Sequence, residues 1–364
     1  MYAILVLEDG TVWQGNGFGA ECKVTGEIVF NTGMVGYEQS ITDPSYYGQI
    51  VCQTYPLVGN YGVCKKEFES DSPKIRGYIV SELCRNPSHY MSETGLNEWL
   101  ESNGIPGIEG IDTRELTKVL RTKGTMLGVL KVSRKPINTE RIIKEAKNVE
   151  APNKIDLINE VTIKKPIRHS GSGKRVVVID CGVKMGIIRA LLARGIETIR
   201  VPARYNADKI MELSPDGVII SNGPGDPKKA DYIIRTVENL IEYKIPLIGI
   251  CLGNQILGLA LGCDTYKMKF GHRGQNHPVI NLETRKCYIT SQNHGYAIIP
   301  GPLDERNVKI TFVNANDGTV EGIEHKKLPI IGVQFHPGAS PGPLDTNFLF
   351  NRFIKIMGSA NAKR

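Results

Sequence analysis

The sequence lacks the patterns that mark several common classes of protein. Its eight cysteines include no C-x-x-C pair, which argues against a zinc ribbon and a disulfide framework, so we expect reduced thiols and no bound metal. No apolar run approaches the roughly 20 residues of a membrane span. The first ten residues lack the charged segment and cleavage site of a signal peptide and predict a strand and a turn. We therefore expect a cytoplasmic protein with no membrane contact.

Strong charge and nucleotide-binding motifs are also missing. The formal net charge of +7 is small for 364 residues, and the densest basic stretch, 164–175, has the composition of a linker, so we expect no nucleic-acid partner. The glycines of 15–19 lack the G-x-G-x-x-G spacing and a following helix. Gly173 and Lys174 do not belong to a phosphate-binding loop of the pattern G-x-x-x-x-G-K-[ST]. Arg168 stands where the first glycine is required, and Arg175 stands where serine or threonine is required. No nucleotide or other cofactor is expected in this chain.

The chain is long enough for two domains, each with its own core. Residues 1–150 mix short strands (3–7, 26–30, 49–54 and 75–80) with helices at 94–102 and from Asp112 to Gly124, and Asp112 and Glu115 form a capping box. Residues 151–173 are polar and contain proline, which favours a linker. Residues 174–364 begin with a regular alternation of strand and helix, so we expect an α/β fold with a mainly parallel sheet flanked by helices.

The sequence Gly-Ile-Cys-Leu-Gly at 249–253 places Cys251 between an apolar strand and an apolar helix. Glycines on both sides allow a strained elbow that lifts the sulfur out of the sheet, as in the G-x-S-x-G pattern. The N-terminus of the following helix favours the thiolate over the thiol. For an arbitrary cysteine a buried structural role is the more common one, but this position predicts a nucleophile.

A thiolate nucleophile needs a histidine and a source of oxyanion stabilisation. His336 follows an apolar strand, 328–335, whose end would place it beside Cys251. His294 is the second candidate, and His272 and His277 come third, against the common alternative of a structural histidine. The Asn-Gly-Pro-Gly-Asp-Pro loop at 222–227 also follows a strand, so its backbone N–H groups are expected at the same edge of the sheet.

Four motifs together resemble class I, triad-type glutamine amidotransferases: Gly-Ile-Cys-Leu-Gly-Asn-Gln at 249–255, Ser-Asn-Gly-Pro-Gly-Asp-Pro at 221–227, Ser-Gln-Asn-His-Gly-Tyr at 291–296 and Gly-Val-Gln-Phe-His-Pro at 332–337. The segments 30–37, 42–46, 55–60 and 110–116 resemble the amino-terminal domain of the small subunit of carbamoyl-phosphate synthetases. Residues 270–278 and 340–343 resemble the same subunit. The resemblance spans nearly the whole chain.

This resemblance implies a subunit that hydrolyses glutamine to glutamate and ammonia. Ammonia would pass to a large subunit, which would use ATP, Mg²⁺ and bicarbonate to make carbamoyl phosphate for pyrimidine or arginine synthesis, and the two chains would form a hetero-oligomer. By the motif match, Cys251 attacks the amide and His336 transfers protons. The match assigns the oxyanion hole to the N–H groups of Leu252 and Gly225. It assigns the glutamine to Gly223, Gln255, Asn293, Gly295 and Tyr296, with Ser45 contributed from the amino-terminal domain, so that the site lies between domains.

The sequence departs from the family pattern at two positions. Gly338 stands where a glutamate orients the catalytic histidine, and Asn254 stands where a histidine is common. Loss of an orienting acid cost a serine protease about 10⁴ in turnover, although a cysteine already poised as thiolate depends less on its partner. Another acid, such as Asp345, could take the place of that glutamate.

Two alternative functions remain at this level. The chain could be a catalytically silent structural or allosteric subunit, with the large subunit using free ammonia; the retained cysteine, histidine and glutamine contacts argue against it. It could also be an amidotransferase serving another acceptor, as in GMP, CTP or anthranilate synthesis. The segments 31–37 and 42–46 argue against that assignment.

Overall fold

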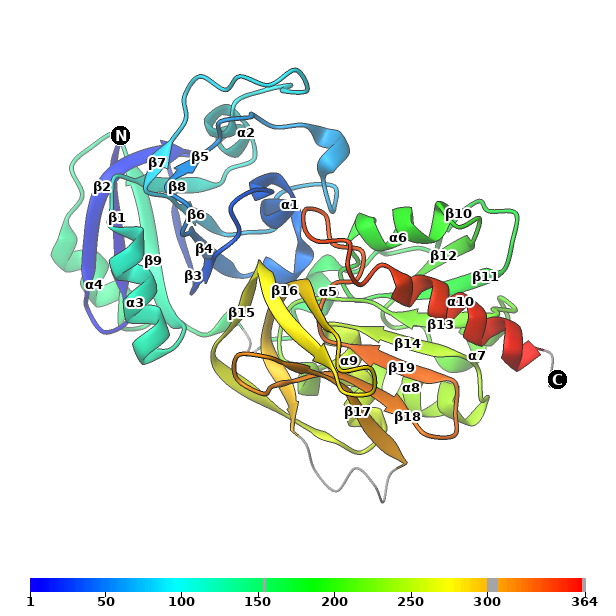
Figure 1. Cartoon of the computed structure of the whole chain (residues 1–364). Helices are drawn as coiled ribbons and strands as arrows, with labels where there is room; N and C mark the ends of the chain where they lie inside the picture. The colour runs from blue at the N-terminus through cyan, green and yellow to red at the C-terminus, as the bar shows by residue number, and fades with distance from the viewer. Residues whose placement is uncertain (153–154, 300–306, 362–364) are drawn as a thin grey trace. The chain divides into compact units, whose positions relative to one another are not determined.

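The computed structural model describes residues 1–152, 155–299 and 307–361 (Figure 1). The chain divides into two compact units, Met1–Ile155 and Asp156–Arg364. Much of the stretch expected as a linker, 151–173, is part of the second unit. It contains α5 (Ile158–Val161) and β10 (Ile167–His169), and β10 pairs with β12 (Glu197–Pro202). Its polar composition suits an exposed edge strand as well as a linker, and only the pairing distinguishes the two.

The first unit is built around a barrel. Within the described residues, seven strands close in the order β1-β2-β8-β6-β4-β3-β9. The pairs β3–β4, β4–β6 and β6–β8 are parallel and the others antiparallel. A mixed domain was expected here, and this prediction is confirmed. The strands are β1 (Tyr2–Leu7), β2 (Val12–Gly19), β3 (Lys23–Asn31), β4 (Gln49–Gln53), β6 (Gly77–Ile79), β8 (Pro106–Glu109) and β9 (Met126–Ser133).

Helices of this unit start at the signals that the sequence provides. The side chain of Asp112 accepts a hydrogen bond of 2.8 Å from the Glu115 N–H and caps α3 (Thr113–Lys123), as the capping box predicts. Asn138 caps α4 (Thr139–Ala146) in the same way. The remaining elements of the unit are α1 (Tyr37–Thr42), α2 (Leu96–Ser102), the short turns η1 (Pro44–Tyr46) and η2 (Lys65–Glu67), and the paired strands β5 (Leu57–Val58) and β7 (Glu82–Leu83).

The second unit contains one large sheet. Among the described residues, ten strands follow the order β10-β12-β11-β13-β14-β19-β18-β16-β15-β17. The part from β12 to β19 is parallel, and the part from β18 to β17 is antiparallel. The strands are β11 (Arg175–Asp180), β13 (Gly217–Ile220), β14 (Leu247–Ile250), β15 (Asp264–Asn281), β16 (Cys287–Ile299), β17 (Val308–Asn314), β18 (Val320–His325) and β19 (Ile330–Val333).

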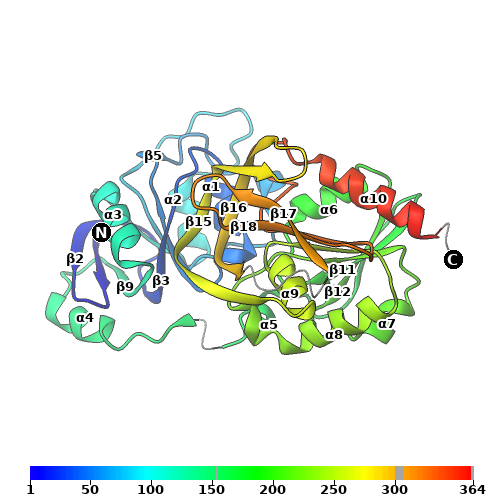
Figure 2. The same ribbon diagram turned by 60° about the horizontal axis from the view of Figure 1, so that its bottom comes forward.

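Helices cover both faces of this sheet, as the alternation of strand and helix predicts (Figure 2). Successive side chains of a strand point to opposite faces. Val177 and Val218 therefore pack with α7 (Ala207–Met211), α8 (Asp231–Glu242) and α9 (Leu252–Ala260), while Val176 and Ile219 pack with α6 (Met185–Leu192) and α10 (Phe348–Asn361). The short turn η4 (Pro227–Lys229) precedes α8. No helix among the described residues is long and apolar enough to cross a membrane.

Candidate active site

Cys251 occupies a strained turn between β14 and α9. Its φ of 55° lies in the left-handed region, which residues with a side chain rarely adopt. It is the residue before the first turn of α9, and its Sγ lies 3.6 Å from the carbonyl oxygen of Asn293. The helix begins at Leu252, so the free N–H groups of its first turn gather beside the cysteine. The elbow predicted from the sequence is therefore present.

The two flanking glycines are needed because the backbone passes close by. A Cβ on Gly249 would lie 2.4 Å from the carbonyl oxygen of Gly253, and a Cβ on Gly253 would lie 2.0 Å from that of Ile220. Neither position leaves room for a side chain. Helix α9 can therefore start directly against the end of β13, which keeps the turn at Cys251 tight.

The loop after β13 lies against the same helix start. A Cβ on Gly223 would lie 2.1 Å from the carbonyl oxygen of Cys181 and 2.9 Å from Cδ2 of Leu252. Asn222 fixes the loop, because its side chain accepts a hydrogen bond of 3.1 Å from the Lys184 N–H and donates one of 2.9 Å to the Gly182 carbonyl oxygen. The turn that follows includes Gly225, with a φ of 95°. The predicted oxyanion donors thus come from two segments held in contact.

His336 follows β19, the parallel neighbour of β14. Ile250 pairs with Val333, so the two strands run to the same edge of the sheet, as the sequence predicts. His336 is buried, and its backbone N–H donates a 3.0 Å hydrogen bond to the carbonyl oxygen of Ser291 on β16. This bond connects the segment that follows β19 to β16, the strand that carries Asn293.

Position 338, where the family glutamate is replaced, is closely packed. A Cβ on Gly338 would lie 3.2 Å from Cε2 of Phe350, so a longer side chain would require that ring to move by a few tenths of an ångström. Asp345, the other acid considered, is exposed, and its Oδ2 accepts a 3.2 Å hydrogen bond from the Ile289 N–H. That bond ties Asp345 to the backbone of β16.

Four of the predicted glutamine contacts of this unit lie on α9 (Gln255) and β16 (Asn293, Gly295 and Tyr296), while Gly223 lies on the loop after β13. Nε2 of Gln255 donates hydrogen bonds of 2.8 Å to the Tyr296 carbonyl oxygen and 3.2 Å to Oε1 of Gln334. Gly295 is packed against the buried Arg273, whose Nη2 would lie 3.2 Å from a Cβ there. The backbone carbonyl oxygen of Asn293 contacts Sγ of Cys251, as described above. The replaced histidine position, Asn254, is also buried, and its Nδ2 donates a 3.3 Å bond to Gln334.

Ser45 belongs to the first unit. It lies in the turn η1, where the Asp43 carboxylate accepts a 2.9 Å hydrogen bond from its N–H, and its side chain is buried. Its contact with glutamine stays a prediction, as does the position of the site between domains.

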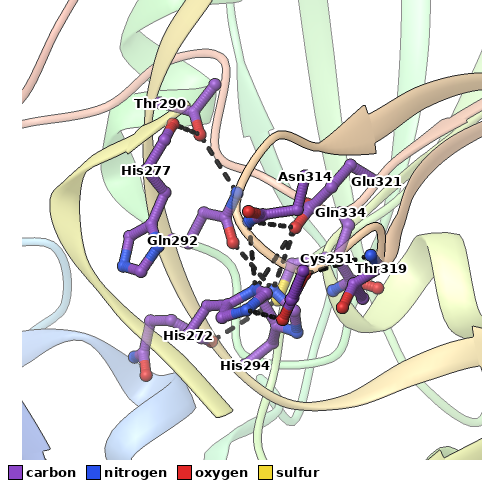
Figure 3. Close-up of polar contacts among 12 residues, drawn as sticks. Cys251, His272, His277, Thr290, Gln292, His294, Asn314, Thr319, Glu321 and Gln334 are labelled. Carbon is purple, nitrogen blue, oxygen red and sulfur yellow. Dashed lines mark hydrogen bonds and ion pairs between the residues drawn. The ribbon is translucent and has the colours of Figure 1, made fainter. Parts of the chain in front are cut away.

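A buried cluster beside this site was not predicted as a unit. His272 on β15, His294 on β16 and Glu321 on β18 meet in the interior (Figure 3). Burial lowers the pKa of His294 far below its usual range, and the nearby His272 adds to this. For His272 burial also acts to lower the pKa, but the Glu321 and Asp317 carboxylates outweigh it and the pKa is raised. His277, the remaining candidate base, has its pKa lowered to about 4 by burial and by His272.

Comparison with known proteins identifies first the class and then the family. The glutamine amidotransferase class-I family matches residues 177–356, which covers the elbow, the loop after β13 and His336. The carbamoyl-phosphate synthase small chain, CPSase domain, family matches residues 5–130. Curated proteins named carbamoyl phosphate synthase small chain match nearly the full length. The chain belongs to the carbamoyl-phosphate synthase small chain family.

Three such relatives illustrate the similarity. The protein of Methanocaldococcus jannaschii is 50% identical over 360 residues, which are 98% of this chain and 99% of that protein. The protein of Archaeoglobus fulgidus is 48% identical over 360 residues, which are 98% of this chain and 99% of that protein. That of Listeria monocytogenes serotype 4b is 48% identical over 354 residues, 97% of this chain and 96% of the relative. The likeness therefore includes both units.

Proposed function

We propose that this chain is the glutaminase subunit of a carbamoyl-phosphate synthase, and that it hydrolyses glutamine through a thioester on Cys251. The observation that carries this proposal is the strained left-handed cysteine at the start of α9, on the same sheet edge as His336. A strained residue at such a turn is retained where the position of its side chain matters for function. A merely structural cysteine would not need two glycines without room for a Cβ beside it.

In the first half of the reaction, the Cys251 thiolate attacks the side-chain carbonyl carbon of glutamine. The carbonyl oxygen becomes an oxyanion, which the N–H groups of Leu252 and Gly225 stabilise. His336 then donates a proton to the amide nitrogen, the carbon–nitrogen bond breaks, and ammonia leaves. The product on the enzyme is a γ-glutamyl thioester. Gln255, Asn293, Gly295 and Tyr296 hold the substrate, with Ser45 supplied by the first unit.

In the second half, His336 removes a proton from water, and the resulting hydroxide attacks the thioester carbon. The carbon–sulfur bond breaks, glutamate leaves and the thiolate is restored. We infer that ammonia passes to a large-subunit partner, where ATP, Mg²⁺ and bicarbonate provide the rest of carbamoyl phosphate. The names of the relatives support this division of labour, since each is a small chain of a synthase.

One specific observation favours a second candidate function. Gly338 replaces the orienting glutamate, and Phe350 packs against the place where that side chain would start. Without the orienting acid, the subunit could be silent in glutamine hydrolysis and serve as a structural partner. The intact elbow and the intact loop after β13 weigh against this, because neither is needed for a structural role.

The deciding experiment measures glutamate release from glutamine by the chain co-purified with its large subunit, with Cys251→Ser as the control. The proposal expects release that the control lacks, while synthesis from free ammonia is equal in both complexes. If both complexes release glutamate only at the background rate, while both still synthesise carbamoyl phosphate from free ammonia, the proposal is overturned in favour of the silent subunit.

A further inference from the structure

The buried cluster of His272, His294 and Glu321 has the geometry of a ligand set. Each residue offers one donor atom, and the three atoms lie within 4.8 Å of one another. Oε1 of Glu321 is 3.3 Å from Nδ1 of His272 and 3.9 Å from Nε2 of His294. The residues come from the strands β15, β16 and β18, and their side chains point toward one another (Figure 3).

In both histidine rings, the nitrogen that points away from Glu321 already has a hydrogen-bond partner. Nε2 of His272 lies 2.9 Å from Oδ2 of Asp317, and Nδ1 of His294 lies 2.9 Å from the carbonyl oxygen of Tyr296. Because a carboxylate and a carbonyl only accept hydrogen bonds, these nitrogens carry the ring hydrogens. The neutral His294 ring then turns the lone pair of Nε2 toward Glu321, and His272 does the same with Nδ1 once it gives up the proton that the Glu321 and Asp317 carboxylates favour. Metal-bound histidines show this arrangement, with the outer N–H donated to a carboxylate or a backbone carbonyl.

The space between the two rings and Glu321 is lined mainly by hydrogen-bond acceptor atoms. Nε2 of His294 faces Oε1 of Gln292 at 3.0 Å, as well as Glu321. Asn314 donates one hydrogen bond, of 3.1 Å, to Oε1 of Glu321. Glu321 is fully buried, and the Gln292 side chain also interacts with its carboxylate, yet among the described residues its Oε2 makes no close hydrogen bond. A buried carboxylate oxygen without a donor is costly, and a cation between these atoms would remove that cost.

We propose that His272, His294 and Glu321 bind one Zn²⁺ ion, although the cysteine pattern of the sequence had suggested no metal. Two imidazoles and a carboxylate are a common ligand set for Zn²⁺, and the Gln292 oxygen is placed to complete it. Ligand atoms around Zn²⁺ at about 2.1 Å lie about 3.4 Å apart, and two of the observed separations, 3.3 and 3.9 Å, are close to this value, while the third is at most 4.8 Å and would shorten on binding. The ion joins β15, β16 and β18, and it thereby fixes the strand that carries Asn293 and Gly295.

The test uses the full chain in a Cys251→Ser background, because a catalytic thiolate would also bind Zn²⁺. The chelator-treated protein is titrated with Zn²⁺ by calorimetry and followed by thermal unfolding. We expect one Zn²⁺ per chain and a rise in Tm on binding. Glu321→Gln, which keeps the shape of the side chain, should weaken binding at least tenfold and reduce the rise in Tm at the same Zn²⁺ concentration. His89→Gln, at an exposed histidine of the first unit, should leave both unchanged.

Three results would overturn the proposal: no Zn²⁺ binding by the folded parent chain, equally tight binding by Glu321→Gln, or an octahedral Co²⁺ spectrum. The first result would mean that a proton on His272 is the occupant. If Glu321→Gln does not fold, His272→Asn takes its place. As an independent measurement, Co²⁺ is bound to the parent chain in place of Zn²⁺ and its visible absorption spectrum is recorded. We expect the spectrum of a tetrahedral site with nitrogen and oxygen ligands. An octahedral spectrum would contradict the site.

Discussion

The backbone N–H of Cys251 donates a 2.8 Å hydrogen bond to the carbonyl oxygen of Val333. The parallel ladder between β14 and β19 therefore continues up to the nucleophile itself. His336 follows three residues beyond Val333, so the position of the candidate base relative to the cysteine is set by backbone pairing. This explains how two residues 85 positions apart in the sequence come to follow neighbouring strands at one edge of the sheet.

Gly223→Ala should abolish most glutamine hydrolysis. A Cβ there would overlap the Cys181 carbonyl oxygen and press on Leu252, so the loop must move away from the elbow. We expect kcat for glutamate release to fall by about 100-fold or more, the loss expected for a misplaced oxyanion donor. Gly358→Ala is the matched control, because it lies on α10 with open space around it and should leave the rate unchanged. An active Gly223→Ala chain would contradict the assigned loop.

Restoring glutamate at position 338 should speed glutamine hydrolysis once space is made. The backbone at Gly338 is not left-handed, and the Phe350 ring makes the tightest contact with a Cβ built there. We expect Gly338→Glu combined with Phe350→Leu to raise kcat by roughly tenfold or more over Phe350→Leu alone, with little change in KM. Steady-state glutamate release by both variants measures this. Equal rates would show that His336 is oriented by other groups.

Ser45→Ala should raise KM for glutamine with a smaller effect on kcat, if the first unit contributes to the site. Loss of one hydrogen bond to a bound substrate costs about 1 kcal/mol, which corresponds to roughly a fivefold rise in KM. Ser102→Ala, on α2 of the same unit, is the control. The KM of the Ser45→Ala variant would stay at the parent value if Ser45 did not contact the substrate.

Glu38 should make the stability of the chain depend on pH near neutrality. Burial raises the pKa of this carboxyl from 4.5 to about 7, although a hydrogen bond from the Cys64 N–H opposes the shift. The folded state thus holds a proton that the unfolded chain releases near pH 4.5. Stability is therefore fully present below pH 4.5 and falls as the pH rises to about 7.

Glu38→Gln, which cannot ionise, should remove this dependence. We expect the variant to be more stable than the parent at pH 8, by at most about 3 kcal/mol, and no more stable at pH 4.5. Thermal unfolding at both pH values measures the difference, with the exposed Glu101→Gln as control. A difference that does not change with pH would refute the raised pKa.

The elbow and its histidine were predictable because local sequence determines them. A short apolar run, two glycines and an apolar helix fix the turn at Cys251, and the run before His336 fixes the neighbouring strand. The glutamine amidotransferase class-I family match covers both segments, and the catalytic roles of Cys251 and His336 stay predictions. The alternation of strands and helices likewise predicts the parallel half of the sheet.

The antiparallel half was harder to predict from the sequence. β15 and β16 carry many polar residues and pair with shifts in register, so they show no regular alternation of apolar and polar positions. The cluster at Glu321 depends on three strands that meet only in the folded sheet. Its sequence signal is weak: His272 and His294 are predicted only as candidate bases, and no motif in the sequence singles out Glu321.

Strand β16 combines two tasks on alternating residues. Gln292 and His294 turn toward Glu321, whereas the residues between and after them, Asn293 and Gly295, are the predicted glutamine contacts. Because the side-chain period of a strand is two, deleting a single residue upstream in β16 would exchange the two sets between faces. The strand therefore tolerates substitutions one at a time far better than any change in its length, and insertions or deletions in this family should avoid it.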